Sequence, residues 1–106
     1  MQDTKQTKVL NLIGLAYRAK KLVTSEKEVL NVVKTDKAKM VFVASDASLK
    51  TKDRFDKKCF YHKVPLYLDF DSDQLAHALG KSLCKIVAIT DAGFTDVVQK
   101  IFMEVK

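Results

Sequence analysis

The stretch Lys39-Met40-Val41-Phe42-Val43-Ala44 decides the fold class of this chain. Its β-branched and aromatic side chains follow one another without a polar interruption, which is typical of a strand buried on both faces. Two shorter runs of similar character occupy residues 64–68 and 85–89, and Pro65 favours a strand end or a sheet edge for the first of them. Strands buried on both faces need helices on both sides. The sequence therefore predicts an α/β protein.

Helical patterns fill the segments between these strands. Apolar residues recur at helical spacing over residues 5–19, and a second helix is predicted from 25 to about 35, after an extended step at residues 22–23. A third helix is predicted over 49–61, with Phe55, Cys59 and Phe60 as its apolar side. Asp71 or Ser72 can cap a short fourth helix, and Gly80 can end it. The last helix carries the clearest apolar stripe, which we assign to the core: Phe94, Val97, Val98, Ile101, Phe102 and Val105.

Length and composition limit the possible classes of protein. The chain has 106 residues, which suits one domain spanning residues 1–106. Three glycines and one proline argue against a loop-rich or all-β design. No apolar run is long enough to cross a bilayer, and the first residues lack the pattern of a secretory signal. We therefore expect a cytoplasmic protein that does not associate with membranes.

The charge of the chain is unevenly distributed. The net charge is +6, yet residues 1–63 hold fifteen Lys or Arg against seven acidic residues, while residues 64–106 hold four against six. Such an asymmetry predicts one positive face and one neutral or acidic face. A basic face attracts nucleic acid or an anionic membrane, although a merely soluble basic surface would have the same composition.

The start of the second predicted helix is a candidate anion site. Ser25 and Glu28 have capping-box spacing, in which the serine hydroxyl accepts a backbone N–H and the glutamate reaches back to the cap. Free N–H groups at a helix start favour anions such as phosphate. Cations beside such a terminus oppose the helix dipole, so an external anion is their expected partner.

Basic residues gather around this helix start. Lys27, Asn31 and Lys34 are spaced by four and three residues, so they share one helix face. Lysine and arginine supply phosphate contacts, and an asparagine amide can both donate to and accept from a base edge. The remaining cations of the cluster are Arg18, Lys20 and Lys21 before the helix, and Lys37 and Lys39 after it. The same face could instead be a solvated helix surface.

Other chemistry is weakly supported. Cys59 and His62 could share a helix face as a nucleophile and base, but no third group orients them, and a buried thiol explains Cys59 better. A zinc site combining these two residues with His77 and Cys84 matches no common ligand spacing. The first strand–helix junction, residues 44–48, lacks the glycines of a phosphate-binding loop. We expect no catalysis, cofactor or metal.

Asp46 and Asp91 form a separate case, because each follows a predicted strand. Open α/β sheets often place functional carboxylates at such positions. Aspartate is also a common turn and cap residue there, and that interpretation is the simpler one.

The motifs of the chain, in their order and spacing, resemble a known family. The run from Asn11 through Gly14-Leu15-Ala16-Tyr17-Arg18 to Val23 is similar to the opening of YlxQ-type bacterial proteins, which belong to the superfamily of small ribosomal proteins that bind kink-turn RNA. Further matching segments are residues 37–39, 44–48, 64–65, 79–80 and 88–94. The resemblance implies a three-layer α/β/α sandwich around a mixed sheet of about four strands.

The resemblance also implies a position for RNA contacts. In the superfamily these come from the start of the second helix and from the loop before the last strand. By position they correspond here to Ser25, Glu26, Lys27, Glu28 and Asn31, and to Lys81, Ser82 and Leu83. The helix start would meet the sheared base pairs of a kinked duplex, and the loop would cover an unstacked nucleotide, against which Leu83 could pack.

The chain departs from the family pattern at several of these positions. The pattern usually has glycine where this chain has Lys20, Ser25 and Asp36. It also has Asn, Glu and Lys where this chain has Lys27, Glu28 and Asn31, so only Glu28 matches. Glycine adopts positive φ without steric cost, so a residue other than glycine at positions 20, 25 and 36 can change or strain the backbone conformation there.

From sequence we therefore predict a monomeric RNA-binding protein for structured, kink-turn or ribosomal RNA. Arg18, Lys20, Lys21, Lys27, Lys34 and Lys37 would hold phosphates, and Ser25, Glu28 and Asn31 would touch bases. The alternative is a protein-interaction module that docks on a ribosomal or transcription protein without base-specific RNA recognition.

Overall fold

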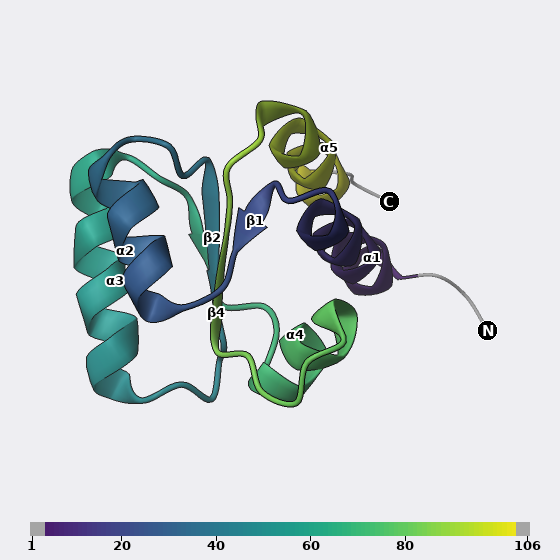
Figure 1. The fold of residues 1–106 in the computed structure, drawn as a ribbon, viewed down its shortest axis with the longest axis horizontal. Helices are drawn as coiled ribbons and strands as arrows, with labels where there is room; N and C mark the ends of the chain where they lie inside the picture. The colour runs from purple at the N-terminus through teal and green to yellow at the C-terminus, as the bar shows by residue number, and fades with distance from the viewer. Residues whose placement is uncertain (1–3, 104–106) are drawn as a thin grey trace.

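The fold is built on a four-stranded sheet with helices on both faces (Figure 1). The computed structural model describes residues 4–103. The elements follow in the order α1 (Lys5–Arg18), β1 (Leu22–Val23), α2 (Glu26–Lys34), β2 (Met40–Val43), α3 (Leu49–His62), β3 (Leu66–Tyr67), α4 (Ser72–Leu79), β4 (Ile86–Ile89) and α5 (Ala92–Met103). Helices α2 and α3 cover one face, and α1, α4 and α5 cover the other. The predicted three-layer α/β/α sandwich is confirmed.

The sheet is mixed and has the strand order β1-β4-β2-β3. Strands β2 and β4 pair antiparallel in the centre, with Met40 opposite Ile89 and Val43 opposite Ile86. Every residue of both strands is buried, as their uninterrupted apolar sequences predict. Strand β3 pairs parallel with β2 at one edge and directly follows Pro65, while β1 pairs antiparallel with β4 at the other edge.

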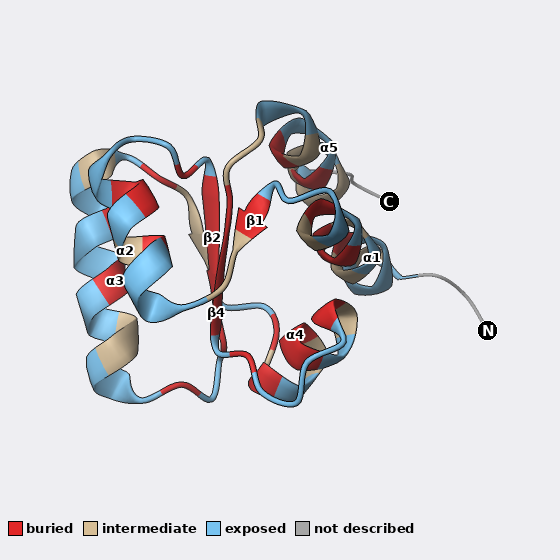
Figure 2. Cartoon of the chain, in the orientation of Figure 1, coloured by how far each residue is buried: buried red, intermediate tan, exposed pale blue. Residues whose placement is uncertain are grey.

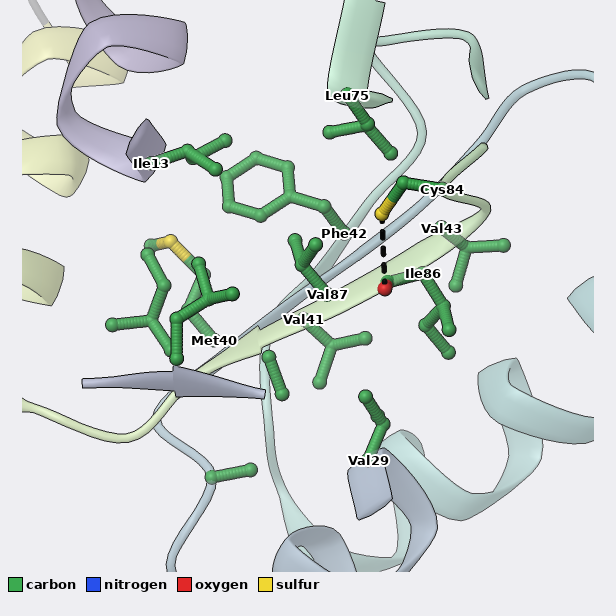
Figure 3. Close-up of a cluster of buried hydrophobic side chains, with 14 of the residues drawn as sticks. Ile13, Val29, Met40, Val41, Phe42, Val43, Leu75, Cys84, Ile86 and Val87 are labelled. Atoms are coloured by element: carbon green, nitrogen blue, oxygen red, sulfur yellow. Dashed lines mark hydrogen bonds between the residues drawn. The ribbon is translucent and has the colours of Figure 1, made fainter. Parts of the chain in front are cut away.

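The core lies on both sides of the central strands (Figure 3). Successive residues of a strand point to opposite faces, so Val41 packs toward Val29 of α2, while Phe42 packs toward Ile13 of α1 and Leu75 of α4. Figure 2 shows the consequence for the helices, whose inner sides are buried and whose outer sides are exposed. Two separate packing interfaces are thus formed from one short strand.

The helix ends follow the predicted capping residues closely. Asp71 and Gln74 form a complete capping box at the start of α4, and Gly80 ends that helix in a left-handed conformation with φ 72°. Three other helices end in the same way, but with Lys20, Asp36 and Lys63 at φ values of 61–62°. In each case the N–H groups of the left-handed residue and of the residue after it bond back to carbonyls of the last turn, as Lys21 does to Ala16 and Val64 does to Cys59.

The prediction for the apolar side of α3 was wrong for one residue. Phe55 and Cys59 are buried, whereas Phe60 is 86% exposed. Residues 55 and 59 are one helical turn apart and define the inner face, and residue 60 lies about 100° further around the helix. In α5, Val98 is buried as predicted, but the assignment of Val97 to the core was wrong: it is 45% exposed because it lies about 100° around the helix from Val98. Val105 lies outside the described residues.

Across residues 4–103, no helix combines the length and apolar character needed to cross a membrane.

Candidate nucleic-acid interface

The outer face of α2 presents the predicted Lys27, Asn31 and Lys34 together. All three side chains are exposed. They line a groove between α2 and α3, together with Arg54 from the neighbouring helix. Lys27 and Asn31 also line a second groove, which lies beside Val23 of β1. Within the described part of the chain these three side chains form no hydrogen bond or ion pair, so their polar groups are available to a ligand.

Ser25 is the cap of α2, as predicted, but the predicted capping box is incomplete. The Ser25 hydroxyl accepts the backbone N–H of Glu28 at 3.1 Å. The Glu28 carboxylate accepts from the Ser25 hydroxyl at 3.4 Å, and no bond from Glu28 to the Ser25 backbone N–H is formed. Ser25 has φ −90°, which is ordinary for a cap, so serine replaces glycine there without backbone strain.

Helices α2 and α3 run side by side in the same direction. At their starts, Arg54 lies 3.6 Å from the Glu26 carboxylate, and the Thr51 hydroxyl donates to the same carboxylate at 3.4 Å. At their ends, Nδ1 of His62 lies 3.3 Å from Asp36. Glu26 therefore contributes to helix–helix contact as well as to the predicted interface. Lys34 lines the groove that contains Arg54 and also a third groove, which is lined by Lys57, Lys58, Tyr61 and His62.

The sheet register places the predicted loop at the same edge as the start of α2. Strand β1 is antiparallel to β4, with Val23 opposite Ala88, so the residues after β1 lie beside the residues before β4. Ser25 follows β1 and the loop Lys81-Ser82-Leu83 precedes β4. In Figure 1 the start of α2 and the segment between α4 and β4 both lie toward the lower end of the sheet. Leu83 is 63% exposed, whereas the next residue, Cys84, is buried and anchors the loop. An apolar side chain is thus presented to solvent where the resemblance implies an unstacked nucleotide.

The other predicted cations lie around the opposite end of β1. The Lys21 carbonyl accepts a hydrogen bond from the backbone N–H of Thr90, and the backbone N–H of Lys39 donates to the Ile89 carbonyl. These bonds place residues 20–21 and 37–39 near the end of β4. Arg18 lies instead beside α4, where it lines a groove with Gln74 and His77. All thirteen predicted contact residues are exposed, but they do not form one compact patch. They lie at both ends of strand β1, along the outer face of α2 and, for Arg18, beside α4.

Two of the departures from the family pattern are visible in the backbone. Lys20 and Asp36 both adopt φ 62°, the conformation that glycine adopts most easily. Each therefore costs conformational energy at the end of α1 or α2. In return, each position carries a charge that glycine would lack.

Sequence reasoning did not identify the contribution of α3. Arg54 lines the groove beside Lys27, and Lys57, Lys58 and Tyr61 line its continuation beside Lys34. The density of basic residues in α3 was a usable signal, but the sequence alone does not show that α3 packs alongside α2.

The alternatives involving Cys59 and the aspartates have structural explanations. Cys59 is 1% exposed, and burial, reinforced by the charge of Asp56, raises its pKa to about 11, so its thiol is a poor nucleophile at neutral pH. Asp46 accepts two hydrogen bonds from Ser72, and Asp91 accepts the backbone N–H of Phe94 at the start of α5. Between residues 4 and 103, no three His, Cys, Asp or Glu side chains are close enough to hold a metal ion.

Comparison with known proteins identifies the family. Residues 7–99 match the model of the ribosomal protein L7Ae/L30e/S12e/Gadd45 family. The chain belongs to this family. It is 40% identical over 94 residues to the RNA-binding protein YlxQ of Enterococcus faecium, covering 89% of this chain and 90% of that protein. It is 38% identical over 85 residues to the RNA-binding protein YlxQ of Bacillus subtilis (strain 168), covering 80% and 85%. The predicted YlxQ-type resemblance is confirmed.

Two solved structures share the fold. A protein of unknown function from Bacillus halodurans C superposes with a TM-score of 0.86 at 32% identity, covering 92% of this chain and 98% of that one. The Giardia lamblia 15.5kD RNA binding protein superposes with a TM-score of 0.81, covering 95% and 88%. Identity to the latter is 21%, so that similarity concerns the fold alone.

Proposed function

We propose that this protein binds structured RNA, with a kink-turn as its preferred target, and that it does so without catalysis. The observation that carries the proposal is the exposed Lys27–Asn31–Lys34 face of α2, which lines a groove with Arg54 and whose three side chains form no hydrogen bond or ion pair with any residue from 4 to 103. The names of the two YlxQ relatives support RNA as the ligand. A cytoplasmic location fits this role.

In this proposal the two kinds of side chain have different tasks. Arg18, Lys20, Lys21, Lys27, Lys34 and Lys37 hold phosphates, which positions the protein on the RNA. Ser25 and Glu28 lie at the start of α2 and Asn31 lies further along its exposed face, where distorted base pairs can present their edges. Lys81, Ser82 and Leu83 approach from the same edge of the sheet and cover an unstacked nucleotide. Glu26 helps to hold Arg54 in the groove.

The test compares a kink-turn RNA with a straight duplex of equal length over a series of salt concentrations. Each phosphate contact contributes about −0.7 to −0.9 to the slope of log K against log salt. We expect Lys27→Ala with Lys34→Ala to weaken binding to both RNAs and to make the slope shallower by about 1.4 to 1.8. Lys100→Ala on α5, an exposed lysine in the opposite helical layer, is the matched control and should change neither.

Asn31→Ala separates shape recognition from charge attraction. It removes an amide but no charge, so we expect a smaller preference for the kink-turn with an unchanged salt slope. Equal affinity for both RNAs, unaltered by Asn31→Ala, would refute kink-turn recognition. If no α2 variant changes RNA binding or cellular function, the alternative of a protein-interaction module would be favoured instead.

A further inference from the structure

The last turns of α3 expose two aromatic side chains on a basic helix. Phe60 is 86% exposed and Tyr61 is 79% exposed. The inner face of this helix is already formed by Phe55 and Cys59, so neither aromatic ring contributes to the core. Both rings are free to contact a ligand, and aromatic side chains are enriched at binding interfaces.

Of the two aromatic residues, Tyr61 lines the groove at the end of α2 and α3, and Phe60 does not. Tyr61 lines this concave surface with Lys57, Lys58 and His62 of α3 and with Lys34, the last residue of α2. The Tyr61 and His62 rings meet edge to face, with centroids 5.0 Å apart. Because His62 is also held by Asp36 at 3.3 Å, one side of the Tyr61 ring has a fixed neighbour. The phenol ring is therefore positioned by its surroundings although it is exposed.

The charges around the ring are predominantly positive. Three lysine side chains from two helices line the groove, and no acidic residue lines it. Lys57 lies 3.2 Å from Asp53, but both side chains are more than 60% exposed, and such a surface ion pair is weak. Asp36 is engaged by His62 and does not line the groove. An anionic ligand would therefore relieve mutual repulsion among the lysines.

This groove continues the interface on α2. Lys34 lines it and also lines the groove that contains Lys27, Asn31 and Arg54. Lys27 and Lys34 are seven residues apart on a helix, about 10 Å along its axis. A chain bound at the start of α2 can thus reach Tyr61 without leaving the cationic surface.

We propose that Tyr61, with Lys34, Lys57 and Lys58, is a stacking site for an unpaired nucleotide that flanks the structured RNA element. The inference rests on the proposed function, which it extends to a single-stranded segment. An aromatic face stacks on any base, and nearby ammonium groups hold the phosphates, so the site requires single-stranded RNA but no particular sequence.

The test uses a kink-turn RNA alone and the same RNA with six unpaired uridines at its 5′ or 3′ end. We expect one of the two tails to tighten binding to the intact protein about tenfold, the scale of stacking one base on an aromatic ring. Tyr61→Ala should abolish that gain without changing affinity for the kink-turn alone. Tyr61→Phe, which keeps the ring, should retain the gain.

Phe60→Ala is the matched control, because Phe60 is the adjacent residue, is equally exposed and does not line the groove. It should leave the tail-dependent gain intact. The inference is overturned if neither tail tightens binding, or if Tyr61→Ala and Phe60→Ala reduce the gain equally. If the protein binds neither the kink-turn nor its tailed forms, the proposed function fails as well.

A polyglutamate of the same charge as the tail distinguishes RNA from an acidic protein partner. It should compete poorly with the tail, because it offers no planar base. Competition as strong as that of oligouridine, unchanged by Tyr61→Ala, would assign the groove to an acidic partner and overturn the stacking site.

Discussion

Helices α1 and α3 have the same length but different relations to the sheet. Each has 14 residues, yet α1 buries four of them and α3 buries only Phe55 and Cys59. Helix α1 lies among α4 and α5, close enough that a Cβ atom at Gly14 would lie 2.7 Å from the Ala78 carbonyl oxygen. Helix α3 packs mainly against α2 and strand β2, and most of its other residues are exposed (Figure 2).

The two helices also use charge differently. Helix α3 carries seven charged side chains of Lys, Arg or Asp, against three in α1, although each has a net charge of +3. A helix that turns most of its residues to solvent can keep many charges hydrated, whereas one packed on two sides cannot. The α2–α3 side is therefore the side suited to a polyanion. Helix α3 itself is held to the rest of the protein by few buried side chains.

The largest expected effect tests that attachment. Phe55→Ala should lower the free energy of unfolding by about 3–5 kcal/mol, because it removes one of two buried anchors and leaves a cavity. Chemical denaturation measures this. Phe60→Ala, on the same helix but exposed, should change the stability by no more than about 0.5 kcal/mol. Equal losses from the two variants would show that α3 is not held in the way its burial indicates.

A smaller effect concerns how the helices end. Gly80 has φ 72° and open space around its missing Cβ, so Gly80→Ala should lower stability by about 1 kcal/mol through backbone strain alone. Lys63 adopts φ 61° at the end of α3, so Lys63→Gly should raise stability by a similar amount, about 1 kcal/mol. Thermal unfolding of both variants tests whether Gly80→Ala lowers stability while Lys63→Gly raises it. A loss of stability in Lys63→Gly would mean that its side chain matters more than its backbone.

The smallest effect concerns a link between the two helical layers. Asp46 follows β2 on the way to α3, and its carboxylate accepts from the Ser72 hydroxyl at 2.7 Å and the Ser72 N–H at 2.8 Å, at the start of α4. These bonds lower the pKa of Asp46 below its ordinary value, although burial opposes them. A lowered pKa stabilises the fold above the unfolded-state pKa, and this contribution is lost as the pH falls through the folded-state pKa.

Asp46→Asn should therefore be less stable than the parent protein near neutral pH, and the difference should shrink below about pH 4. Urea unfolding at several pH values measures it. Asp53→Asn, an exposed aspartate on α3, is the control and should show little pH-dependent difference. A difference that stays constant down to low pH would contradict a role for the ionised carboxylate.

Local features of this protein were predictable from sequence because they depend on neighbouring residues. The helix starts at Ser25 and Asp71 and the helix end at Gly80 follow from capping chemistry within one turn. The fully buried strands β2 and β4 follow from continuous apolar runs. Phe60 was misplaced because a one-residue step on a helix changes the face, and apolar character alone does not reveal that step.

Some residues of the candidate interface could likewise be predicted from local sequence, and others could not. Lys27, Asn31 and Lys34 were found because helical spacing places them on one face. Arg54 and Tyr61 were missed because they join that face only through the parallel packing of α3 against α2. Similarly, the sequence placed Lys20 and Lys21 in one cluster with Ser25, whereas the register of β1 on β4 places them at opposite ends of that strand.

The sequence by itself determined which segments are helices and strands, most of the positions that face the core, and that the first part of the chain is basic. These properties depend on side-chain period and local hydrogen bonding. Only the tertiary structure decided that α2 and α3 lie parallel on one face of the sheet, and that Tyr61 meets Lys34 there. The reason is physical: helix pairing is set by how the core packs between elements far apart in sequence, which no local pattern records.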